Sequence, residues 1–504
     1  MNSRMIQFIL GKILIVEGTL LLLPFLVSLL YKEPQGTYYV GIATICFLLG
    51  GLISLKRPAN TCFYLKEGCI ATSLSWIFMS IFGALPFYVT GEIPSFTDAL
   101  FETISGFTTT GASILSNVEA LSHTALFWRS FTHWIGGMGV LVFLLAIMPL
   151  SGGSHINLMR AESPGPSVGK LVPKVRQTAR ILYLIYIGLT LLEIVLLLFG
   201  KIPLFDALTT SFGTAGTGGF GIWNSSIGNY SAYIQWVVTI FMMLFGVNFN
   251  FFYFVLFRQY AKAFSMEEVR YYFLVILSAI IIILPDVRQI TGNFPDALRH
   301  TAFQVASIIT TTGFSTMDFD TWSQTSRTVL VLLMFIGACA GSTGGGIKVS
   351  RFIMLVKSMK RELMSYIHPK SVMKIKMDGK PVEHGIARSV NVYFISFVMI
   401  FVISVLLLSL EGNDLTTNFT AVAATINNIG PGLELVGPTR NFGFFHMFSK
   451  YVLMFDMLAG RLELFPLLIL FYPTLWKEMF ERRVHLYSGT NTTHIPKEFR
   501  RKKA

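Results

Sequence analysis

A short glycine-centred pattern occurs four times in this chain, each time just outside an apolar stretch. The four copies read Phe-Thr-Thr-Thr-Gly-Ala-Ser at 107–113, Gly-Thr-Gly-Gly-Phe-Gly at 216–221, Thr-Thr-Thr-Gly-Phe-Ser-Thr at 310–316 and Asn-Asn-Ile-Gly-Pro-Gly at 427–432. Aligned on Gly111, Gly219, Gly313 and Gly430, they recur at intervals of 108, 94 and 117 residues, which indicates an internal repeat. Four equivalent loops around one axis would enclose a pore.

Composition determines the surroundings in which these loops fold. Of the 504 residues, 53% are hydrophobic and 13% are charged, whereas soluble domains carry roughly 25% charged residues. We therefore expect an all-α, multi-pass membrane protein, since a helix of roughly 20 apolar residues crosses the hydrocarbon core. Ten stretches are suitable, at roughly 5–30, 37–55, 69–90, 124–150, 179–200, 232–257, 268–290, 326–355, 386–410 and 445–476.

Lys and Arg residues are distributed unevenly among the loops that connect these stretches. Of the 40 basic residues, 31 lie in the N-terminal arm and in 56–68, 151–181, 257–271, 348–388 and 477–504, and seven lie in the alternate loops. By the positive-inside rule, the first set and both termini are cytoplasmic. The net charge of +13 is then mainly a topology signal, and no nucleic-acid partner is expected.

Each glycine loop falls on the outer side, after a segment too short to cross the membrane. The segments 96–107, 204–214, 296–309 and 415–426 suit half-helices that enter from outside and return as extended chain. In the first three, an Asp-Ala-Leu triplet starts at Asp98, Asp206 and Asp296. A helix, a half-helix with its loop and a second, inner helix make one unit. Four units use eight of the ten stretches, and the two before residue 56 are extra.

The loop backbone needs a partner for its polar groups. Non-helical backbone at membrane depth is tolerated only where protein buries it or where it lines water. Glycine permits backbone conformations that other residues resist, and rings of carbonyl groups replace the hydration shell of potassium in ion filters. The negative C-terminal end of each half-helix also favours a cation. Close helix packing through Gly and Thr is the alternative, but it does not account for four copies in register.

The repeat therefore predicts a cation filter, built from each glycine and the two residues before it. Its residues are Thr109, Thr110, Gly111, Thr217, Gly218, Gly219, Thr311, Thr312, Gly313, Asn428, Ile429 and Gly430. A membrane enzyme would need a nucleophile and a base that face each other at depth, and His133 with Ser154 or His155 forms no obvious pair. We expect neither an enzyme nor a bound cofactor.

A glycine-rich segment interrupts the third inner stretch. Between the apolar halves 326–336 and 347–356 lies Gly337-Ala-Cys-Ala-Gly-Ser-Thr-Gly-Gly-Gly346, and each glycine costs a helix about 1 kcal/mol. The helix is expected to break there, on the cytoplasmic side of the filter, because Lys348 and Arg351 follow at once. A packed glycine kink is the alternative. A nucleotide-binding loop is excluded, because the Walker A pattern requires Lys directly after its glycine.

Arg461 lies inside the last inner stretch, where a charged side chain is costly and is functional by default. We expect it to project toward the pore below the filter and to hydrogen-bond carbonyl groups, or Ser342 and Thr343. The alternative is a structural ion pair with Asp456 or Glu463.

Three weaker features have structural interpretations. Arg129, near the outer end of the first inner stretch, is expected to be a partner for Glu102 or an interfacial residue. The basic segment 357–388 is either the charge excess of an inner loop or a docking surface. The four cysteines show no metal-ligand spacing and are expected to be free thiols.

Together these motifs resemble the Trk/Ktr/HKT superfamily of potassium-uptake proteins, most closely its bacterial TrkH branch, over nearly the whole chain. The resemblance rests on the four glycine loops and on His133-Trp-Ile-Gly-Gly-Met-Gly, Arg160-Ala-Glu-Ser-Pro-Gly-Pro, Gly341-Ser-Thr-Gly-Gly-Gly-Ile-Lys348 and Gly460-Arg-Leu-Glu-Leu464. It implies a pseudo-fourfold potassium channel in the bacterial inner membrane, surrounded by lipid and assembled as a homodimer with one pore per protomer. Glycine at position 111, where sodium-preferring relatives carry serine, implies a preference for potassium over sodium.

The resemblance also implies regulation from the cytoplasm. It makes the break at 337–348 an intramembrane loop that blocks the pore when closed. The implied gate residues are Gly341, Ser342, Thr343, Gly344, Gly345, Gly346, Lys348 and Arg461. A cytosolic TrkA-type ring is implied as regulator, so that NAD(H), ATP or ADP would act only through that partner.

The expected organisation follows the repeat. Two extra helices occupy 1–56, pore repeats occupy 69–150, 178–258, 268–366 and 385–480, and a basic cytoplasmic tail occupies 481–504. The function predicted is potassium uptake through a channel. The alternative is a secondary symporter that has the same filter but couples potassium to protons or sodium; single-channel recordings distinguish the two.

Overall fold

The computed structural model describes residues 2–56, 58, 64–139, 175–370 and 373–473. In these ranges most residues are helical, and β1 (Lys376–Met377) pairs with β2 (Lys380–Pro381) in a short antiparallel hairpin. The motif that begins at Arg160, the end of the stretch 124–150 and the tail 481–504 lie outside the described residues.

The helices follow the order that the repeat predicts. A hairpin comes first, formed by α1 (Ser3–Tyr31) and α2 (Gly36–Ser54). Four units then each supply an outer helix, a half-helix and an inner helix, in that order. The first unit consists of α3 (Leu65–Val89), α4 (Phe96–Phe107) and α5 (His123–Met138), and the second of α8 (Val175–Phe199), α9 (Leu204–Ala215) and α10 (Ala232–Phe245), followed by α11 (Phe249–Leu256) and α12 (Tyr260–Ser265). The third consists of α13 (Glu267–Thr291), α14 (Phe294–Ile309) and α15 (Gln324–Ile336), followed by α16 (Val349–Ile367), and the fourth of α17 (His384–Ser409), α18 (Leu415–Ile426) and α19 (Met447–Arg461), followed by α20 (Phe465–Leu468). Short 3₁₀ turns are η1 (Val118–Ala120), η2 (Phe319–Thr321), η3 (Glu434–Val436) and η4 (Ile469–Phe471). The all-α fold with four pseudo-repeats is confirmed.

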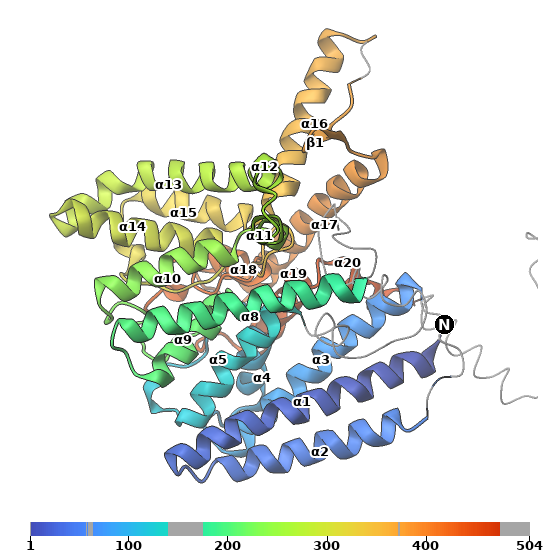
Figure 1. Cartoon of the computed structure of the whole chain (residues 1–504), viewed down its shortest axis with the longest axis vertical. Helices are drawn as coiled ribbons and strands as arrows, with labels where there is room; N and C mark the ends of the chain where they lie inside the picture. Colours follow the sequence, from blue (N-terminus) through green and yellow to red (C-terminus); the bar gives the residue numbers. More distant parts are fainter. Residues whose placement is uncertain (1, 57, 59–63, 140–174, 371–372, 474–504) are drawn as a thin grey trace, which may run out of the picture.

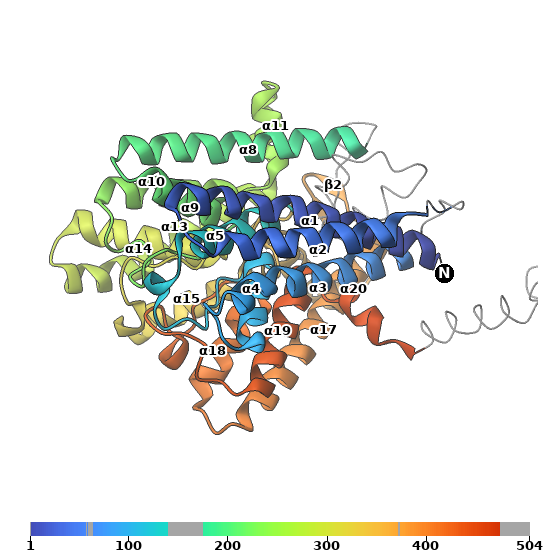
Figure 2. The same cartoon turned by 90° about the horizontal axis from the view of Figure 1, so that it is seen from below.

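The long helices lie side by side in one body. Figure 1 shows α1 and α2 along its lower edge, α3 and α8 above them, and α13 along its upper edge. Seen from below, α8 lies on one flank and α17 to α19 lie on the other (Figure 2). Helix α1 packs on α2, α3 and α5, so the extra hairpin covers the first unit. Helix α16 leaves the body and projects from it (Figure 1).

The outer helices are unbroken, whereas the inner helices of the second, third and fourth units are interrupted. Among the described residues, α1, α2, α3, α8, α13 and α17 are each long and apolar enough to cross a membrane. The expected straight span 232–257 instead bends by 94° between α10 and α11, where Asn248 caps α11 by accepting the N–H of Asn250. The span expected at 445–476 ends its long helix at Arg461. Polar residues and glycines under the loops therefore divide inner spans that were expected to be continuous.

The half-helices match the predicted short segments to within two residues at each end. The side chains of Ser95, Asn293 and Asp414 cap three of them by accepting a backbone N–H from the third helical residue, as N-cap residues do. Asp98, Asp206 and Asp296 lie in the first turns, where the positive end of the helix dipole stabilises a carboxylate. This placement explains the Asp-Ala-Leu triplets.

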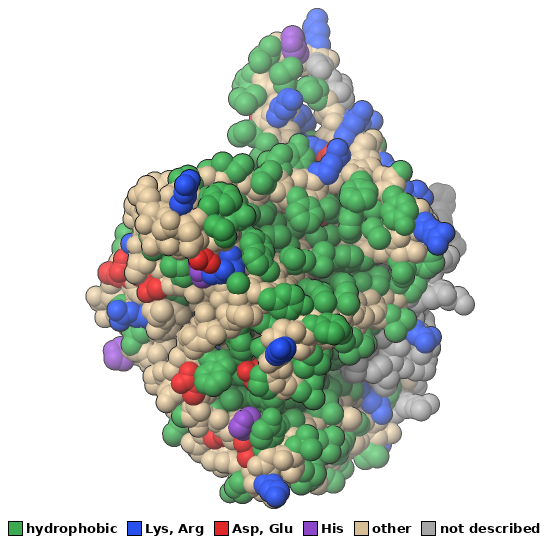
Figure 3. Space-filling model, turned by 60° about the vertical axis from the view of Figure 1, so that its left-hand side comes forward, with side chains coloured by type: hydrophobic (Ala, Val, Ile, Leu, Met, Phe, Trp, Pro, Cys, Tyr) green, Lys and Arg blue, Asp and Glu red, His purple; other side chains and the backbone are tan. Residues whose placement is uncertain are grey.

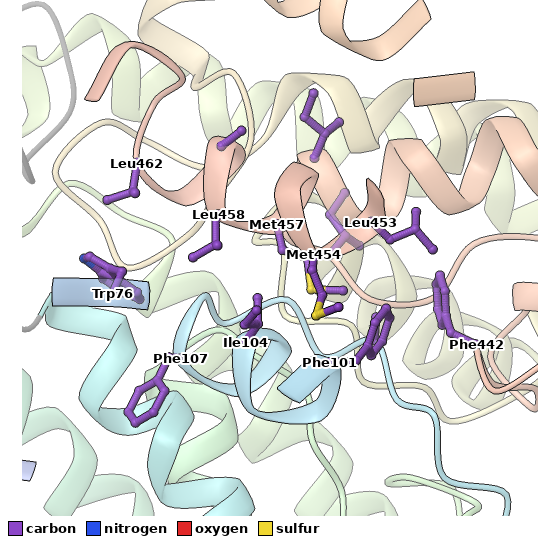
Figure 4. Packing of buried hydrophobic residues seen from close by; sticks show 14 of the residues in the cluster. Trp76, Phe101, Ile104, Phe107, Phe442, Leu453, Met454, Met457, Leu458 and Leu462 are labelled. Atoms are coloured by element: carbon purple, nitrogen blue, oxygen red, sulfur yellow. The ribbon is translucent and has the colours of Figure 1, made fainter. Parts of the chain in front are cut away.

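The surface and the interior of the body both suit a lipid environment. Figure 3 shows a face covered largely by hydrophobic side chains, and Leu48, Leu184 and Leu277 on the outer helices and the extra hairpin are more than half exposed. Inside, Phe101 and Ile104 of α4 lie against Met454 and Met457 of α19 (Figure 4). Because lipid is as apolar as these side chains, close packing rather than water exclusion holds such helices together.

Candidate functional site

The four glycine loops share one backbone conformation. The residue two places before the glycine has a positive φ in every loop: Thr109 +56°, Thr217 +53°, Thr311 +59° and Asn428 +54°. The glycines are also left-handed: Gly111 +78°, Gly219 +80°, Gly313 +86° and Gly430 +96°. Non-glycine residues with positive φ are uncommon, and strained backbone of this kind is concentrated at functional sites.

Each loop is attached to its half-helix by the same hydrogen bond. The N–H of the residue just before the glycine donates to the carbonyl five residues earlier: Thr110 to Ser105 at 2.8 Å, Gly218 to Gly213 at 2.9 Å, Thr312 to Ser307 at 2.8 Å and Ile429 to Ala424 at 2.8 Å. This is the pattern of a helix end followed by a left-handed residue. The helix end therefore determines where each loop starts.

The loops contact one another in a closed ring. A Cβ atom at Gly111 would collide with the carbonyl oxygen of Gly218, one at Gly219 with that of Thr312, and one at Gly313 with that of Ile429. At Gly430 it would lie 2.8 Å from the carbonyl oxygen of Thr110, which closes the ring. Each glycine thus makes room for the carbonyl that precedes the next loop's glycine. The structure brings together all twelve predicted filter residues in this ring.

A hollow lies on each side of the ring. The outer hollow is lined by all four glycines, Gly111, Gly219, Gly313 and Gly430, together with residues such as Arg440 and Asn441. The inner hollow is lined by Gly137, Lys348, Arg461 and the glycines of the segment 341–346. The ring therefore separates two hollows, and the interrupted third inner helix borders the inner one.

The segment 337–348, which we call the intramembrane loop, lies against the third and fourth glycine loops, 310–316 and 427–432. We number the four glycine loops in chain order and name them filter loops 1 to 4 after their predicted role. The N–H of Gly345 donates to Thr311 Oγ1 at 2.6 Å. A Cβ atom at Gly344 would lie 2.9 Å from the carbonyl oxygen of Thr310, and one at Gly345 would lie 2.6 Å from that of Asn427. Only glycine fits at these two positions without displacing the filter loops. The predicted helix break is confirmed.

Contacts with the second and third units hold the intramembrane loop in place. Glu268 Oε1, in the first turn of α13, accepts the N–H of Ala340 at 2.6 Å and the N–H of Ser350 at 3.1 Å. Thr343 Oγ1 donates to the carbonyl of Phe245 at 3.2 Å. The sequence reasoning missed Glu268; the available signal was an acidic residue at the start of an apolar helix.

Arg461 lies at the end of α19 and reaches the intramembrane loop. Its guanidinium donates to the carbonyl of Thr343 at 2.9 Å and to that of Gly137 at 2.9 Å, and it also bonds the carbonyl of Gly136. The expected carbonyl contacts are therefore present, and Thr343 contributes its backbone rather than its hydroxyl. Of the two alternative partners, Glu463 forms a salt bridge with Arg351 and Asp456 accepts a hydrogen bond from Ser404 Oγ at 2.8 Å.

The remaining gate residues lie in the same place. Lys348 is 4% exposed, and its ammonium group bonds the carbonyl of Gly344, which closes the end of the loop on itself. Ser342 Oγ donates to the carbonyl of Cys339 at 2.6 Å. Lys348 also has a positive φ of +83°. The eight predicted gate residues thus form one cluster beside the inner hollow, next to the predicted filter.

Comparisons with known proteins agree over nearly the whole chain. A sequence model of the TrkH family, described as a cation transport protein, matches residues 38–483. The chain is 35% identical over 486 residues to the Trk system potassium uptake proteins TrkH of Salmonella typhimurium and of Escherichia coli K12, and the alignments cover 95% of this chain and 100% of each relative. The crystal structure of the potassium transporter TrkH from Vibrio parahaemolyticus superposes with a TM-score of 0.85 at 33% identity, and the match covers 94% of this chain and 100% of that one. The chain therefore belongs to the TrkH family of cation transport proteins, which are multi-pass membrane transporters and not enzymes.

Proposed function

We propose that this chain is the potassium-conducting subunit of a Trk uptake system. The observation that carries the proposal is the closed ring of four loops, in which each glycine packs against the carbonyl before the next glycine. Rings of backbone carbonyls are the means by which filters replace the hydration shell of potassium. The relatives with 35% identity are potassium uptake proteins by name. Potassium is then the transported ion and not a resident cofactor.

The electrostatics of the half-helices support a cation at the ring. The C-terminal ends of α4, α9, α14 and α18 lead directly into the four loops, and the C-terminal end of a helix carries partial negative charge. Hydroxyl and amide side chains of Thr109, Thr217, Thr311 and Asn428 are buried beside the ring. The site thus offers oxygen atoms and negative dipole ends, which a dehydrated monovalent cation requires.

The intramembrane loop is the proposed gate. It occupies the inner side of filter loops 3 and 4, so a cation that leaves the filter inward meets backbone before it reaches the inner hollow. Arg461 places a positive charge against the carbonyl of Thr343 and adds an electrostatic barrier to the same obstruction. Conduction therefore requires the loop to move away from Thr311 and Asn427.

Regulation from the cytoplasm would act on this loop through α16. The loop continues without interruption into α16 (Val349–Ile367), and Lys and Arg residues gather on the projecting part of the molecule (Figure 3). With both termini cytoplasmic and the chain in the bacterial inner membrane, this basic surface faces a TrkA-type nucleotide-sensing ring. Two protomers of a homodimer would present two such surfaces, and charge would steer the docking.

Growth and single-channel measurements test the proposed function together. Expression of the chain should restore growth at low potassium to a host that lacks its own uptake systems. The purified protein in a planar bilayer should give unitary currents that reverse near the potassium equilibrium potential. Transport without unitary currents, at a fixed ratio to protons or sodium, would replace the channel by the symporter. Growth rescue that depends on sodium and not on potassium would refute potassium as the cargo.

A further inference from the structure

A buried ion pair lies directly behind the first two filter loops. Arg129 Nε of the inner helix α5 lies 2.6 Å from Glu102 Oε1 of the half-helix α4. The two side chains are 3% and 0% exposed, which makes this the most buried ion pair among the described residues. The expected pairing of Arg129 with Glu102 is confirmed. Charges so deep in a membrane protein are costly unless every hydrogen-bonding position is used, so their other partners matter.

Glu102 holds filter loop 1. Its carboxylate accepts a hydrogen bond from Ser113 Oγ at 2.9 Å and one from the N–H of Ile114 at 3.0 Å. These residues follow Gly111 by two and three positions. The carboxylate thus fixes the chain where it leaves the filter, eleven residues after Glu102 itself.

Arg129 holds filter loop 2. Its Nη1 donates to the carbonyl of Gly221 at 2.7 Å, and its Cζ lies 3.6 Å from the centre of the Phe220 ring. The ring of His133, one helical turn further along α5, stacks on the same Phe220 at 4.2 Å between centroids. Phe220 and Gly221 directly follow the filter glycine Gly219, so α5 of the first unit clamps the loop of the second.

Only the junction of loops 1 and 2 uses an almost fully buried charged pair in the described structure. At the junction of loops 3 and 4, Arg327 pairs with Asp320 at 3.0 Å and with Glu434 at 2.7 Å, but its side chain is 18% exposed. Nine residues before the filter glycine, the half-helices carry Glu102, Thr210, Gln304 and Ala421. Loops 4 and 1 are joined by Asn428 Nδ2, which donates to Thr110 Oγ1 at 2.9 Å, and loops 2 and 3 by the N–H of Ile227, which donates to the carbonyl of Ser315 at 3.0 Å. The deep burial of the Glu102–Arg129 pair therefore distinguishes the junction of loops 1 and 2 from the other charged junction.

We propose that Glu102 and Arg129 are positioning residues that set the spacing between filter loops 1 and 2 and thereby the preference for potassium over sodium. The proposal rests on the proposed function, since it presumes that the loops select a cation. Whether selectivity depends on the size of the carbonyl cage or on the field strength of its carbonyls, the spacing of the loops enters both. Neither side chain touches the ion; both act through the backbone that they hold.

Three substitutions test the pair at different points, with the potassium-to-sodium permeability ratio as readout. Glu102→Gln removes the negative charge and keeps the shape. Arg129→Lys keeps the positive charge but loses the planar fork that serves Glu102 and Gly221 together. Phe220→Leu removes the stacked ring without any change of charge, so it remains informative if the charge variants fail to fold. Lys450→Gln is the matched control, because Lys450 pairs with Asp98 at the other end of the same half-helix, at 2.6 Å.

We expect each of the three variants to lower the permeability ratio roughly five- to tenfold, the factor that corresponds to one hydrogen bond of ordinary strength. Lys450→Gln should keep the wild-type ratio. Thermal unfolding of each purified variant separates a change of selectivity from a loss of fold. Folded variants with an unchanged ratio, or a control that loses selectivity equally, would overturn the proposed positioning role. A wild-type ratio near one would likewise overturn the inference, because the loops would then not select potassium. A wild-type protein that conducts no potassium would instead overturn the proposed function itself.

Discussion

Gly345 donates its backbone N–H to Thr311 Oγ1 over 2.6 Å, so the intramembrane loop is hydrogen-bonded to the filter itself. Thr311 is also one of the left-handed residues of the ring. A movement of the intramembrane loop must therefore break a contact with the filter. The proposed gate and the proposed filter are therefore adjacent parts of one assembly.

Gly111→Ser should lower the preference for potassium over sodium. The new Cβ would collide with the carbonyl oxygen of Gly218, and the φ of +78° is unfavourable for serine. Loop 2 must shift, which changes the carbonyl cage. Bi-ionic reversal potentials measure the effect, and a wild-type protein that conducts sodium as well as potassium would contradict the selectivity expected here.

Alanine at the other filter glycines should show a graded effect. A Cβ at Gly219 collides with the carbonyl oxygen of Thr312, whereas one at Gly430 lies 2.8 Å from that of Thr110. Gly430→Ala should therefore impair potassium currents less than Gly219→Ala does. Equal impairment in recordings at matched expression would mean that backbone strain, and not the contact between loops, determines the outcome.

Deletion of residues within 341–346 should raise potassium flux. The glycine run occupies the space under filter loops 3 and 4. A shortened segment between α15 and α16 cannot extend into that space. Rubidium uptake into proteoliposomes measures flux, and the permeability ratio serves as the control because the filter stays intact. Unchanged flux with an intact filter would remove the intramembrane loop from the gating mechanism.

Arg461→Ala should act in the same direction as the deletion. The substitution removes the contacts with the carbonyls of Thr343, Gly136 and Gly137 and the positive charge beside the obstruction. A loss of about 1.4 kcal/mol from the closed state would raise the open-to-closed ratio about tenfold. Single-channel open probability reports this ratio. The open probability of Arg461→Lys should lie between those of the wild type and Arg461→Ala.

Glu268→Ala should loosen the intramembrane loop from behind. The carboxylate accepts the N–H groups of Ala340 and Ser350, and a buried N–H without a partner costs about 1–3 kcal/mol. We expect a lower unfolding temperature and a higher potassium flux. Glu268→Gln, which keeps an acceptor oxygen, should retain most of the stability. A stable Ala variant with wild-type flux would show that Glu268 does not hold the closed loop.

Charge reversal on the basic surface should weaken regulation without affecting conduction. Lys360→Glu and Lys374→Glu change exposed residues on α16 and just beyond it, and opposite charges steer the docking of an acidic partner. Co-purification of the candidate ring, and the response of currents to ATP, ADP and NADH, should both decline. Arg288→Glu is the control, because Arg288 is an exposed residue in the last turn of α13, away from α16. Activity that ignores these nucleotides in the wild type with the ring present would refute the partner.

The sequence alone determined the four loops, the half-helices before them and the break at 337–348. These features depend on local physics: glycine spacing, segment lengths too short to span, and N-cap side chains that start three of the four half-helices. The same local reasoning predicted one straight span at 232–257, where the chain bends by 94°, because the bend depends on Asn248 and its surroundings in the folded chain.

Only the tertiary structure decided between partners that the sequence left open. Arg461 bonds backbone carbonyls and Glu463 pairs with Arg351, although both acids near Arg461 were candidates. Glu268 reaches Ala340 across 72 positions of the chain, and Arg129 reaches Gly221 across 92. A buried charge takes whichever groups the packed helices bring within hydrogen-bonding distance, and that choice is made by the fold as a whole because no short stretch of sequence contains both partners.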